Sequence, residues 1–240
     1  MQIIPAIDLK DGKCVRLYKG EESNVTVFSE KPGDVAKKWE DAGAGLIHVV
    51  DLDGAFSGEP VNVSAIEDIL SSVACPVQLG GGIRNIETVR EYIGLGIKRI
   101  IIGTAAFSDN GFLKQACMEF PDTIAVGIDT KNGKIAVKGW TQVIDTDSKE
   151  VLREFEAIGV SAILNTNIER DGTMEGISLD QVREFTAASP IPVIASGGIA
   201  STDDLDKLAT IEELGLTGAI LGKSLYTGAI DLKKAIERYS

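Results

Sequence analysis

Two aspartates stand in matching short motifs in the two halves of the sequence. Asp8 opens Asp-Leu-Lys-Asp-Gly-Lys, and Asp129 opens Asp-Thr-Lys-Asn-Gly-Lys 121 positions later. Each directly follows an apolar run, at residues 3–7 and 123–128. A carboxylate at the end of a buried strand is partly desolvated, which raises its pKa and suits it to proton transfer near neutral pH. A lone aspartate would more simply order a loop, but the repeated motif predicts an acid–base pair.

Four short pairs that contain glycine follow other apolar runs. The two pairs of the first half match the two pairs of the second half at nearly the same distance along the sequence as the two aspartates. Glycine lets the backbone approach an oxyanion closely, and the N-terminus of a following helix offers unpaired N–H groups. A single Gly-Gly would more simply form a tight turn. Two such sites, one in each half, predict a substrate that carries two phosphates. The pairs are Gly81 with Gly82, Gly103 with Thr104, Gly197 with Gly198, and Gly222 with Lys223.

Several single residues add to these motifs. Thr166 ends an apolar run and is a candidate for positioning the substrate, with a plain strand-end threonine as the alternative. Arg84 is a candidate phosphate ligand and Arg16 a candidate for substrate binding, with solvated surface arginines as the alternative. Trp140 could stack on a flat heterocycle or only pack within its loop. His48, the only histidine, lies inside an apolar run, which indicates a core or strand-end histidine rather than a catalyst.

The composition excludes several classes of protein. The formal net charge of −12 argues against a broad surface for nucleic acid or for an anionic membrane. No residues have metal-ligand spacing, so we expect no metal, and the three scattered cysteines indicate reduced thiols. The first residues lack the pattern of a signal peptide, and no apolar run approaches the roughly 18 residues of a membrane span. We therefore expect a cytoplasmic monomer that binds a small molecule with two phosphates, and neither nucleic acid nor a membrane.

These residues need a scaffold that brings the ends of eight apolar runs together. The runs are short and continuously apolar, as strands buried on both faces are. Longer amphipathic segments separate them, and this alternation predicts βαβ units with a parallel sheet. The runs cover residues 3–7, 46–50, 77–79, 99–102, 123–128, 162–164, 192–195 and 218–221. The helical segments include residues 34–42, 63–71, 86–95, 149–158, 179–188, 202–214 and 230–239, with Asn85, Ser178 and Ser201 at N-cap positions.

Eight βα units in 240 residues fit one closed barrel. We predict the α/β class and a (βα)8 TIM barrel built from two similar (βα)4 halves, with an open doubly wound sheet as the alternative. A single domain should cover residues 1–240, with half-barrels at roughly 1–121 and 122–240. Active sites of such barrels lie at the C-terminal ends of the strands, where Asp8, Asp129 and the glycine pairs all fall. A pseudo-twofold axis would place the two carboxylates across the mouth from each other.

A combination of motifs along nearly the whole chain resembles a known family. It resembles the ProFAR isomerases of histidine biosynthesis, which act on phosphoribosylformimino-5-aminoimidazole carboxamide ribotide. The motifs lie at residues 5–9, 15–17, 48–55, 80–84, 129–130, 138–140, 166–173, 196–199 and 222–224.

The resemblance implies an Amadori rearrangement, which converts an aminoaldose into an aminoketose without a cofactor. It implies that Asp129 is the general acid, which protonates the ribose ring oxygen and opens the ring to a Schiff base. Asp8 would be the general base, which removes the proton at C2 to give an enolamine. Thr166 would position the substrate, and Gly172 would contact a phosphate.

Other functions remain open. The cyclase subunit of imidazole glycerol phosphate synthase shares the repeated half-barrel, but Pro-Ala-Ile-Asp-Leu in the first run and Gly139-Trp140 favour the isomerase. A dual-specificity isomerase that also accepts phosphoribosylanthranilate is a further alternative. The non-enzymatic alternative is a sensor barrel that binds a bisphosphate.

Overall fold

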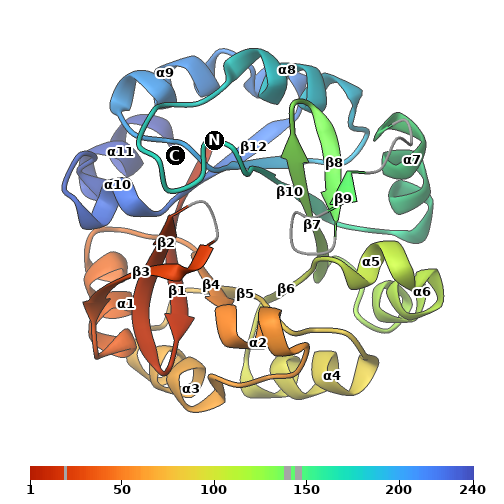
Figure 1. Ribbon diagram of the computed structural model, residues 1–240, viewed down its shortest axis with the longest axis horizontal. Coiled ribbons are helices and arrows are strands. Elements are labelled where there is room, and N and C mark those ends of the chain that lie inside the picture. The colour runs from red at the N-terminus through yellow and green to blue at the C-terminus, as the bar shows by residue number, and fades with distance from the viewer. Residues whose placement is uncertain (19–20, 138–141, 144–147) are drawn as a thin grey trace.

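Eight parallel strands close into a ring in the computed structural model, which describes residues 1–18, 21–137, 142–143 and 148–240. Pairing of β1 with β12 and of β10 with β7 completes the ring (Figure 1). Each of the eight predicted apolar runs lies on one of these strands, so the predicted (βα)8 barrel is confirmed. The strands are β1 (Gln2–Lys10), β4 (Ile47–Asp51), β5 (Val77–Gly80), β6 (Arg99–Ile102), β7 (Ile124–Lys131), β10 (Ala162–Asn167), β11 (Val193–Ser196) and β12 (Leu216–Leu221).

The strands are apolar throughout because both of their faces are buried. On β1, Ile4 and Ala6 belong to the cluster that fills the barrel interior. Ile3, Ile7 and Leu9 belong to the larger cluster of the outer core. Every second residue therefore points into the barrel. The inward-pointing residues at the C-terminal ends of the strands form the mouth of the barrel.

A ring of helices covers the outside of the barrel (Figure 1). Asn85 and Ser201 cap α4 and α9 through their side chains, as predicted. Ser178 also occupies the predicted N-cap position, of α8, but its side chain makes no capping hydrogen bond. The segment predicted at 202–214 ends as α-helix at Ala209 and continues as a 3-10 turn at Glu212–Leu214. The long helices are α1 (Pro32–Asp41), α3 (Val63–Ser72), α4 (Ile86–Leu95), α6 (Asn110–Glu119), α7 (Ser148–Ile158), α8 (Leu179–Ala188), α9 (Thr202–Ala209) and α11 (Leu232–Tyr239).

Antiparallel strands extend β1 and β7 beyond the barrel. The first extension comprises β2 (Lys13–Tyr18) and β3 (Glu21–Ser29), and the second comprises β8 (Lys134–Val137) and β9 (Gln142–Val143). The two lie on opposite sides of the barrel opening in Figure 1. The sequence motifs around Asp8 and Asp129 therefore continue into hairpin turns rather than directly into helices.

The hairpin turns repeat in atomic detail. Asp11 and Asn132 have φ angles of 49° and 50°, and each precedes a glycine with a positive φ, as two-residue hairpin turns require. The amide of Asp11 donates to Asp53 Oδ2 at 2.7 Å, and the amide of Asn132 donates to Glu169 Oε2 at 2.9 Å. Asp53 and Glu169 are themselves 116 positions apart. The same clamp thus holds the first hairpin turn of each half.

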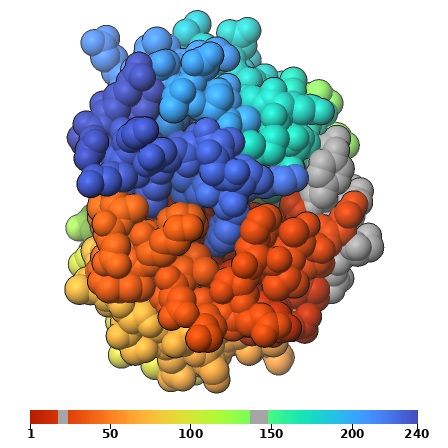
Figure 2. Space-filling view, turned by 90° about the vertical axis from the view of Figure 1, so that its left-hand side faces the viewer, coloured from red at the N-terminus to blue at the C-terminus, as the bar shows by residue number. Residues whose placement is uncertain are grey.

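The N-terminal and C-terminal parts of the chain pack against each other on one side of the molecule (Figure 2). This contact follows from the pairing of β1 with β12. Among the helices of the described ranges, none is both long and apolar enough to cross a membrane.

Candidate active site

Asp8 and Arg16 form an ion pair at the mouth of the barrel. Asp8 lies near the C-terminal end of β1, and Arg16 lies on β2, with its Nη1 atom 2.7 Å from Oδ2 of Asp8. Their side chains are 16% and 11% exposed, respectively. Burial raises the pKa of the Asp8 carboxyl above its ordinary value, and the adjacent guanidinium opposes that rise. A carboxylate with a raised pKa is a stronger base than one in water, which suits Asp8 to accept a proton.

Arg16 also links Asp8 to the loop after β12. Its Nη2 donates to the carbonyl of Ala6, and its guanidinium carbon lies 5.2 Å from the centroid of the Tyr226 ring. A Cβ atom at Gly222 would come within 2.8 Å of the same guanidinium carbon. A side chain at position 222 would therefore have to displace the guanidinium of Arg16, which is buried in the mouth rather than solvated on the surface.

Asp129 and Thr166 lie across the mouth from Asp8. Four steps along the ring separate β1 from β7 in either direction, so the two strands are opposite. Asp129 is partly exposed and pairs with Ala136 of β8, just as Asp8 pairs with Val15 of β2. Thr166 of β10 is the register partner of Asp129. The structure thus brings Thr166 beside the second carboxylate.

Asp171 is a further acidic residue that the sequence motifs did not single out as part of the site. It follows β10, and its amide donates to the carbonyl of Asn167. Burial raises its pKa to about 6, with a further rise from the negative charge of Asp8 and opposing effects from Arg16 and Lys223. A carboxyl with such a pKa can donate a proton near neutral pH. The signal was the Arg-Asp-Gly-Thr motif at 170–173, which carried no chemistry by spacing alone.

The raised pKa of Asp171 predicts a stability change that depends on pH. A raised acid pKa means that the folded state binds the proton more tightly than the unfolded chain. This contribution is fully present below about pH 4 and is lost as pH rises through about 6. Asp171→Asn should therefore stabilise the fold at pH 8, by an amount on the order of 1–3 kcal/mol, and the gain should vanish near pH 4. Urea unfolding at both pH values tests this.

The control for that experiment is Asp180→Asn, at an exposed position in the first turn of α8. It should give no gain at either pH. An equal gain from both variants, or a gain from Asp171→Asn that persists at pH 4, would refute the link to titration of Asp171.

The loops after β5 and β11 are built on matching glycines. Gly81 and Gly197 have φ angles of +104° and +87°. A Cβ at Gly81 would lie 2.1 Å from the carbonyl oxygen of Asp51, and one at Gly197 would lie 2.6 Å from that of Asn167. Such distances exclude any side chain. Gly82 and Gly198 repeat the pattern, with φ angles of +72° and +85° and backbone atoms within 3 Å of a Cβ.

The neighbouring loops lead into the short helices α5 (Ala105–Ser108) and α10 (Lys223–Tyr226). The N-termini of α4 and α9 are already capped by side chains, whereas the cap positions of α5 and α10 make no side-chain capping bond. A Cβ at Gly103 would meet no protein atom within 4 Å. The space beside this residue is therefore open, and no clash requires a glycine there. Exposed Thr104 is the cap position of α5, and the start of a helix without a side-chain cap is a place where an anion can bind.

The remaining predicted residues have different surroundings. Lys223 donates from Nζ to the carbonyl of Gly172 at 2.8 Å, which joins two predicted phosphate ligands. Arg84 is exposed and lies over Gly58, where a Cβ would come within 2.3 Å of its Nη1 atom. Trp140 lies outside the described residues.

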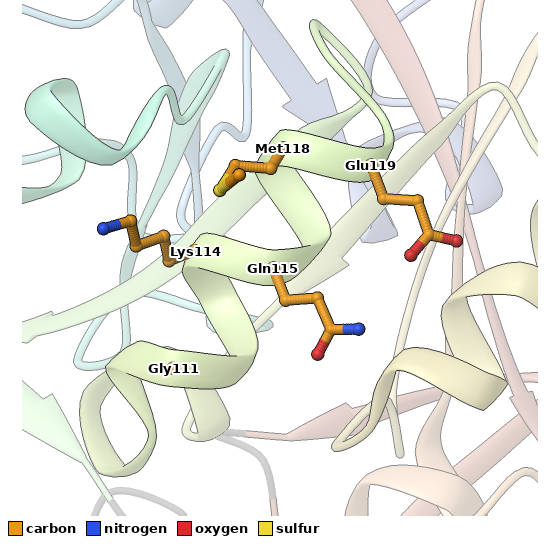
Figure 3. A pocket seen from close by; sticks show the side chains of 5 residues that line it. All are labelled: Gly111, Lys114, Gln115, Met118 and Glu119. Atoms are coloured by element: carbon orange, nitrogen blue, oxygen red, sulfur yellow. The ribbon is translucent and has the colours of Figure 1, made fainter.

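A cavity of about 360 Å³ opens beside the ion pair. Its lining combines the cations Arg16 and Lys223 with residues of β2 and β3, among them Asn24, Thr26 and Phe28. A larger hollow of about 470 Å³ lies on α6, with Lys114 and Met118 on one side of the helix and Gln115 and Glu119 on the other (Figure 3). This second hollow contains none of the predicted site residues, whereas two of them, Arg16 and Lys223, line the cavity beside the ion pair.

Comparisons with known proteins identify the family to which the sequence is similar. Residues 2–231 match the family model described as "Histidine biosynthesis protein". A protein of Trichlorobacter lovleyi is 52% identical over 99% of this chain and 97% of its own length, and one of Geobacter sp. strain M21 is 53% identical over 98% and 97%. A protein of Gloeothece citriformis is 47% identical over 99% and 92%. All three are named 1-(5-phosphoribosyl)-5-((5-phosphoribosylamino)methylideneamino) imidazole-4-carboxamide isomerase.

Proposed function

The chain belongs to the family of histidine biosynthesis proteins, and from this premise we propose how the mouth of its barrel carries out catalysis. Its activity is that of an isomerase of histidine biosynthesis. The names of its relatives describe a carboxamide that carries two phosphoribosyl groups. One phosphate would bind at the loops after β5 and β6 and the other at the loops after β11 and β12. The sugar between them would then lie over the centre of the mouth.

The reaction is an Amadori rearrangement that uses the two facing carboxyls in turn. Asp129 protonates the ribose ring oxygen as the C1–O bond breaks and the nitrogen lone pair forms a C=N bond. Asp8 removes the proton from C2, and the electrons of that C–H bond form the enolamine. C1 then gains a proton and the C2 hydroxyl loses one, which gives the aminoketose. The oxidation of C2 balances the reduction of C1 within one molecule, so the reaction needs no external redox partner.

The observation that carries this proposal is the duplicated mouth. Asp8 and Asp129 lie on opposite strands, each at the base of a hairpin, with matching glycine loops on either side. A substrate held at both ends would present its reacting carbons between the two carboxyls, and such positioning contributes strongly to rate. Arg16, paired with Asp8, would be displaced toward substrate oxygens when Asp8 takes up its proton.

Asp171 is a second candidate for the acid. Its pKa of about 6 leaves it partly protonated near neutral pH. The charges of Asp8 and Arg16 both act on its titration, so Asp171 lies close enough to this ion pair to be coupled to it. Asp129 is preferred as the acid because of its symmetry with Asp8, and the kinetics of Asp129→Asn and Asp171→Asn separate the two candidates.

The activity is tested by incubating the purified chain with the bis-phosphorylated aminoaldose and following the aminoketose by chromatography and mass spectrometry. Conversion without any added cofactor is expected. A chain that instead turned the aminoketose and ammonia into an imidazole product would be a cyclase. Binding of substrate without conversion would indicate a sensor. Parallel incubation with phosphoribosylanthranilate tests dual specificity.

The two phosphate sites predict matched losses of substrate affinity. Gly103→Asp adds a negative charge in open space, and Lys223→Glu reverses a charge on the opposite side of the mouth. Each should raise KM by about tenfold or more, since a charged contact contributes roughly 1.5–3 kcal/mol. Initial-rate kinetics at fixed ionic strength measure the effect.

The controls are Gly94→Asp in α4, where a Cβ also meets no atom, and exposed Lys98→Glu. Both should leave KM near its original value. If only one of the two mouth variants raises KM, the substrate is held by one phosphate site and the two-site proposal fails.

A further inference from the structure

Three hydrogen-bonded polar side chains cross the inside of the barrel on adjacent strands, and the mechanism above uses none of them. Nη1 of Arg99 on β6 donates to Oε1 of Gln78 on β5 at 3.1 Å. The amide nitrogen of Gln78 lies 3.1 Å from Nδ1 of His48 on β4. Gln78 is fully buried, whereas His48 is 8% exposed. The row therefore runs from the partly exposed Arg99 at the N-terminal end of β6 to His48 on β4, the strand that pairs with β1.

The chemistry of the three groups fixes the direction of every hydrogen bond. A guanidinium can only donate, so the amide oxygen of Gln78 faces Arg99. The amide NH2 then faces His48 and can only donate, so Nδ1 of His48 must accept and carries no proton. Nδ1 without a proton leaves the neutral ring with its proton on Nε2. The row thus selects one tautomer of the only histidine in the chain.

The Nε2 atom of His48 is left for a ligand. Among the described residues, none makes a hydrogen bond to Nε2. Nε2 is nevertheless not one of the fully buried side-chain atoms of those residues that lack a partner. It therefore keeps access to solvent. His48 is the register partner of Ala6, and Val50 is the partner of Asp8. The imidazole consequently lies one inward step below the Asp8 carboxyl.

A neutral ring suits this place better than a charged one. Burial and the nearby charge of Arg16 lower the pKa of His48 to about 3. An imidazolium below Asp8 would add a second cation beside that carboxyl and weaken it as a base. A neutral N–H can orient a substrate oxygen and leave the base strength of Asp8 unchanged.

We propose that His48 is a substrate-binding residue whose Nε2–H donates to a sugar oxygen beside the carbon that Asp8 deprotonates, and that Gln78 and Arg99 are positioning residues that fix its tautomer. The identity of the acceptor rests on the proposed isomerase mechanism. The tautomer does not, because it follows from the three side chains alone.

The tautomer is measured by nitrogen NMR of tag-free protein labelled in the imidazole ring. A single histidine gives a single pair of ring signals, so no assignment is needed. We expect an unprotonated Nδ1 and a protonated Nε2 at pH 7. Gln78→Glu replaces the donor by a carboxylate that only accepts, and should move a proton to Nδ1. A wild-type spectrum with Nδ1 protonated, or with both tautomers in exchange, would overturn the proposal.

Two further variants test the role of the anchor. Arg99→Met should release the Gln78 amide to rotate and give a mixture of tautomers. Lys98→Met removes a cation from the adjacent, exposed position and should leave the spectrum unchanged. Equal spectra for Arg99→Met and the wild type would show that Arg99 does not position the row.

Kinetics test the donor itself. In His48→Gln the new side chain can place an amide donor near the position of Nε2. In His48→Leu the new side chain fills a similar volume without a donor. We expect His48→Leu to lower kcat/KM by about tenfold or more, and His48→Gln to recover most of the loss. If His48 only fills space, leucine should be tolerated better than glutamine in the buried interior. A kcat/KM of His48→Leu equal to or higher than that of His48→Gln would therefore refute the role of His48 as a hydrogen-bond donor. A wild-type chain with no isomerase activity would refute the proposed function and leave the tautomer result standing.

Discussion

Asp8→Asn is expected to lower kcat by about 10²–10⁴-fold, the range that a positioned general base contributes, while the barrel stays folded. Asparagine keeps the size of the side chain and can still accept a hydrogen bond from Arg16, whose Nη1 lies 2.7 Å from the carboxyl. It cannot take up a proton, so the C2–H bond of the substrate would have no base. KM should change far less than kcat, because the substrate is held mainly through its phosphates. Initial rates over a range of substrate concentrations give both constants.

Asp11→Asn is the matched control for this variant. Asp11 stands three residues further along, in the exposed hairpin turn, and the equivalent position of the second half already carries Asn132. Its φ of 49° is one that asparagine tolerates. The control should keep near-full activity. Near wild-type turnover in Asp8→Asn would remove Asp8 from the mechanism.

Asp129→Asn is expected to reduce kcat by a comparable factor of about 10²–10⁴. Ring opening needs a proton on the ribose oxygen, and asparagine cannot supply one. The position at the base of the β8 hairpin beside Thr166 would be kept, so far-ultraviolet circular dichroism and the unfolding midpoint should be nearly unchanged. A substrate analogue whose ring is already open should be much less sensitive to this change, because the step that needs the acid has been bypassed.

The same measurements on Asp171→Asn identify the acid. If Asp129 is the acid, the open-ring analogue rescues Asp129→Asn and not Asp171→Asn. The reverse pattern, together with the loss of a kinetic pKa near 6 in Asp171→Asn, would assign the proton to Asp171. Full activity of Asp129→Asn with the closed-ring substrate contradicts its proposed role outright.

The barrel was predictable because its strands are buried on both faces. Short apolar runs leave few alternatives to a parallel sheet with covering helices, and each of the eight runs lies on a strand. The duplicated motifs also predicted which strand ends would correspond. Gly81 and Gly197 confirm this in detail, because each is forced to be glycine by the carbonyl oxygen of the last residue of the preceding barrel strand.

The contacts between segments could not be predicted in the same way. Arg16 carries no sign in the sequence that it will turn back toward Asp8, because that contact depends on the β1–β2 hairpin. The raised pKa of Asp171 comes from burial and from the charge of Asp8, which is far away in sequence. His48 was expected to be a core histidine, and its burial agrees. Its directed hydrogen bond to Gln78 depends on strand register and on Arg99.

The most direct measurement is the structure of Asp8→Asn crystallised with the closed-ring substrate, since this variant should bind without turning over. The account predicts one phosphate at the loops of Gly82 and Gly103 and the other at those of Gly198 and Lys223, with the ribose to be opened lying between residue 8 and Asp129. Both phosphates on one side of the mouth, or a ribose distant from either residue, would contradict it.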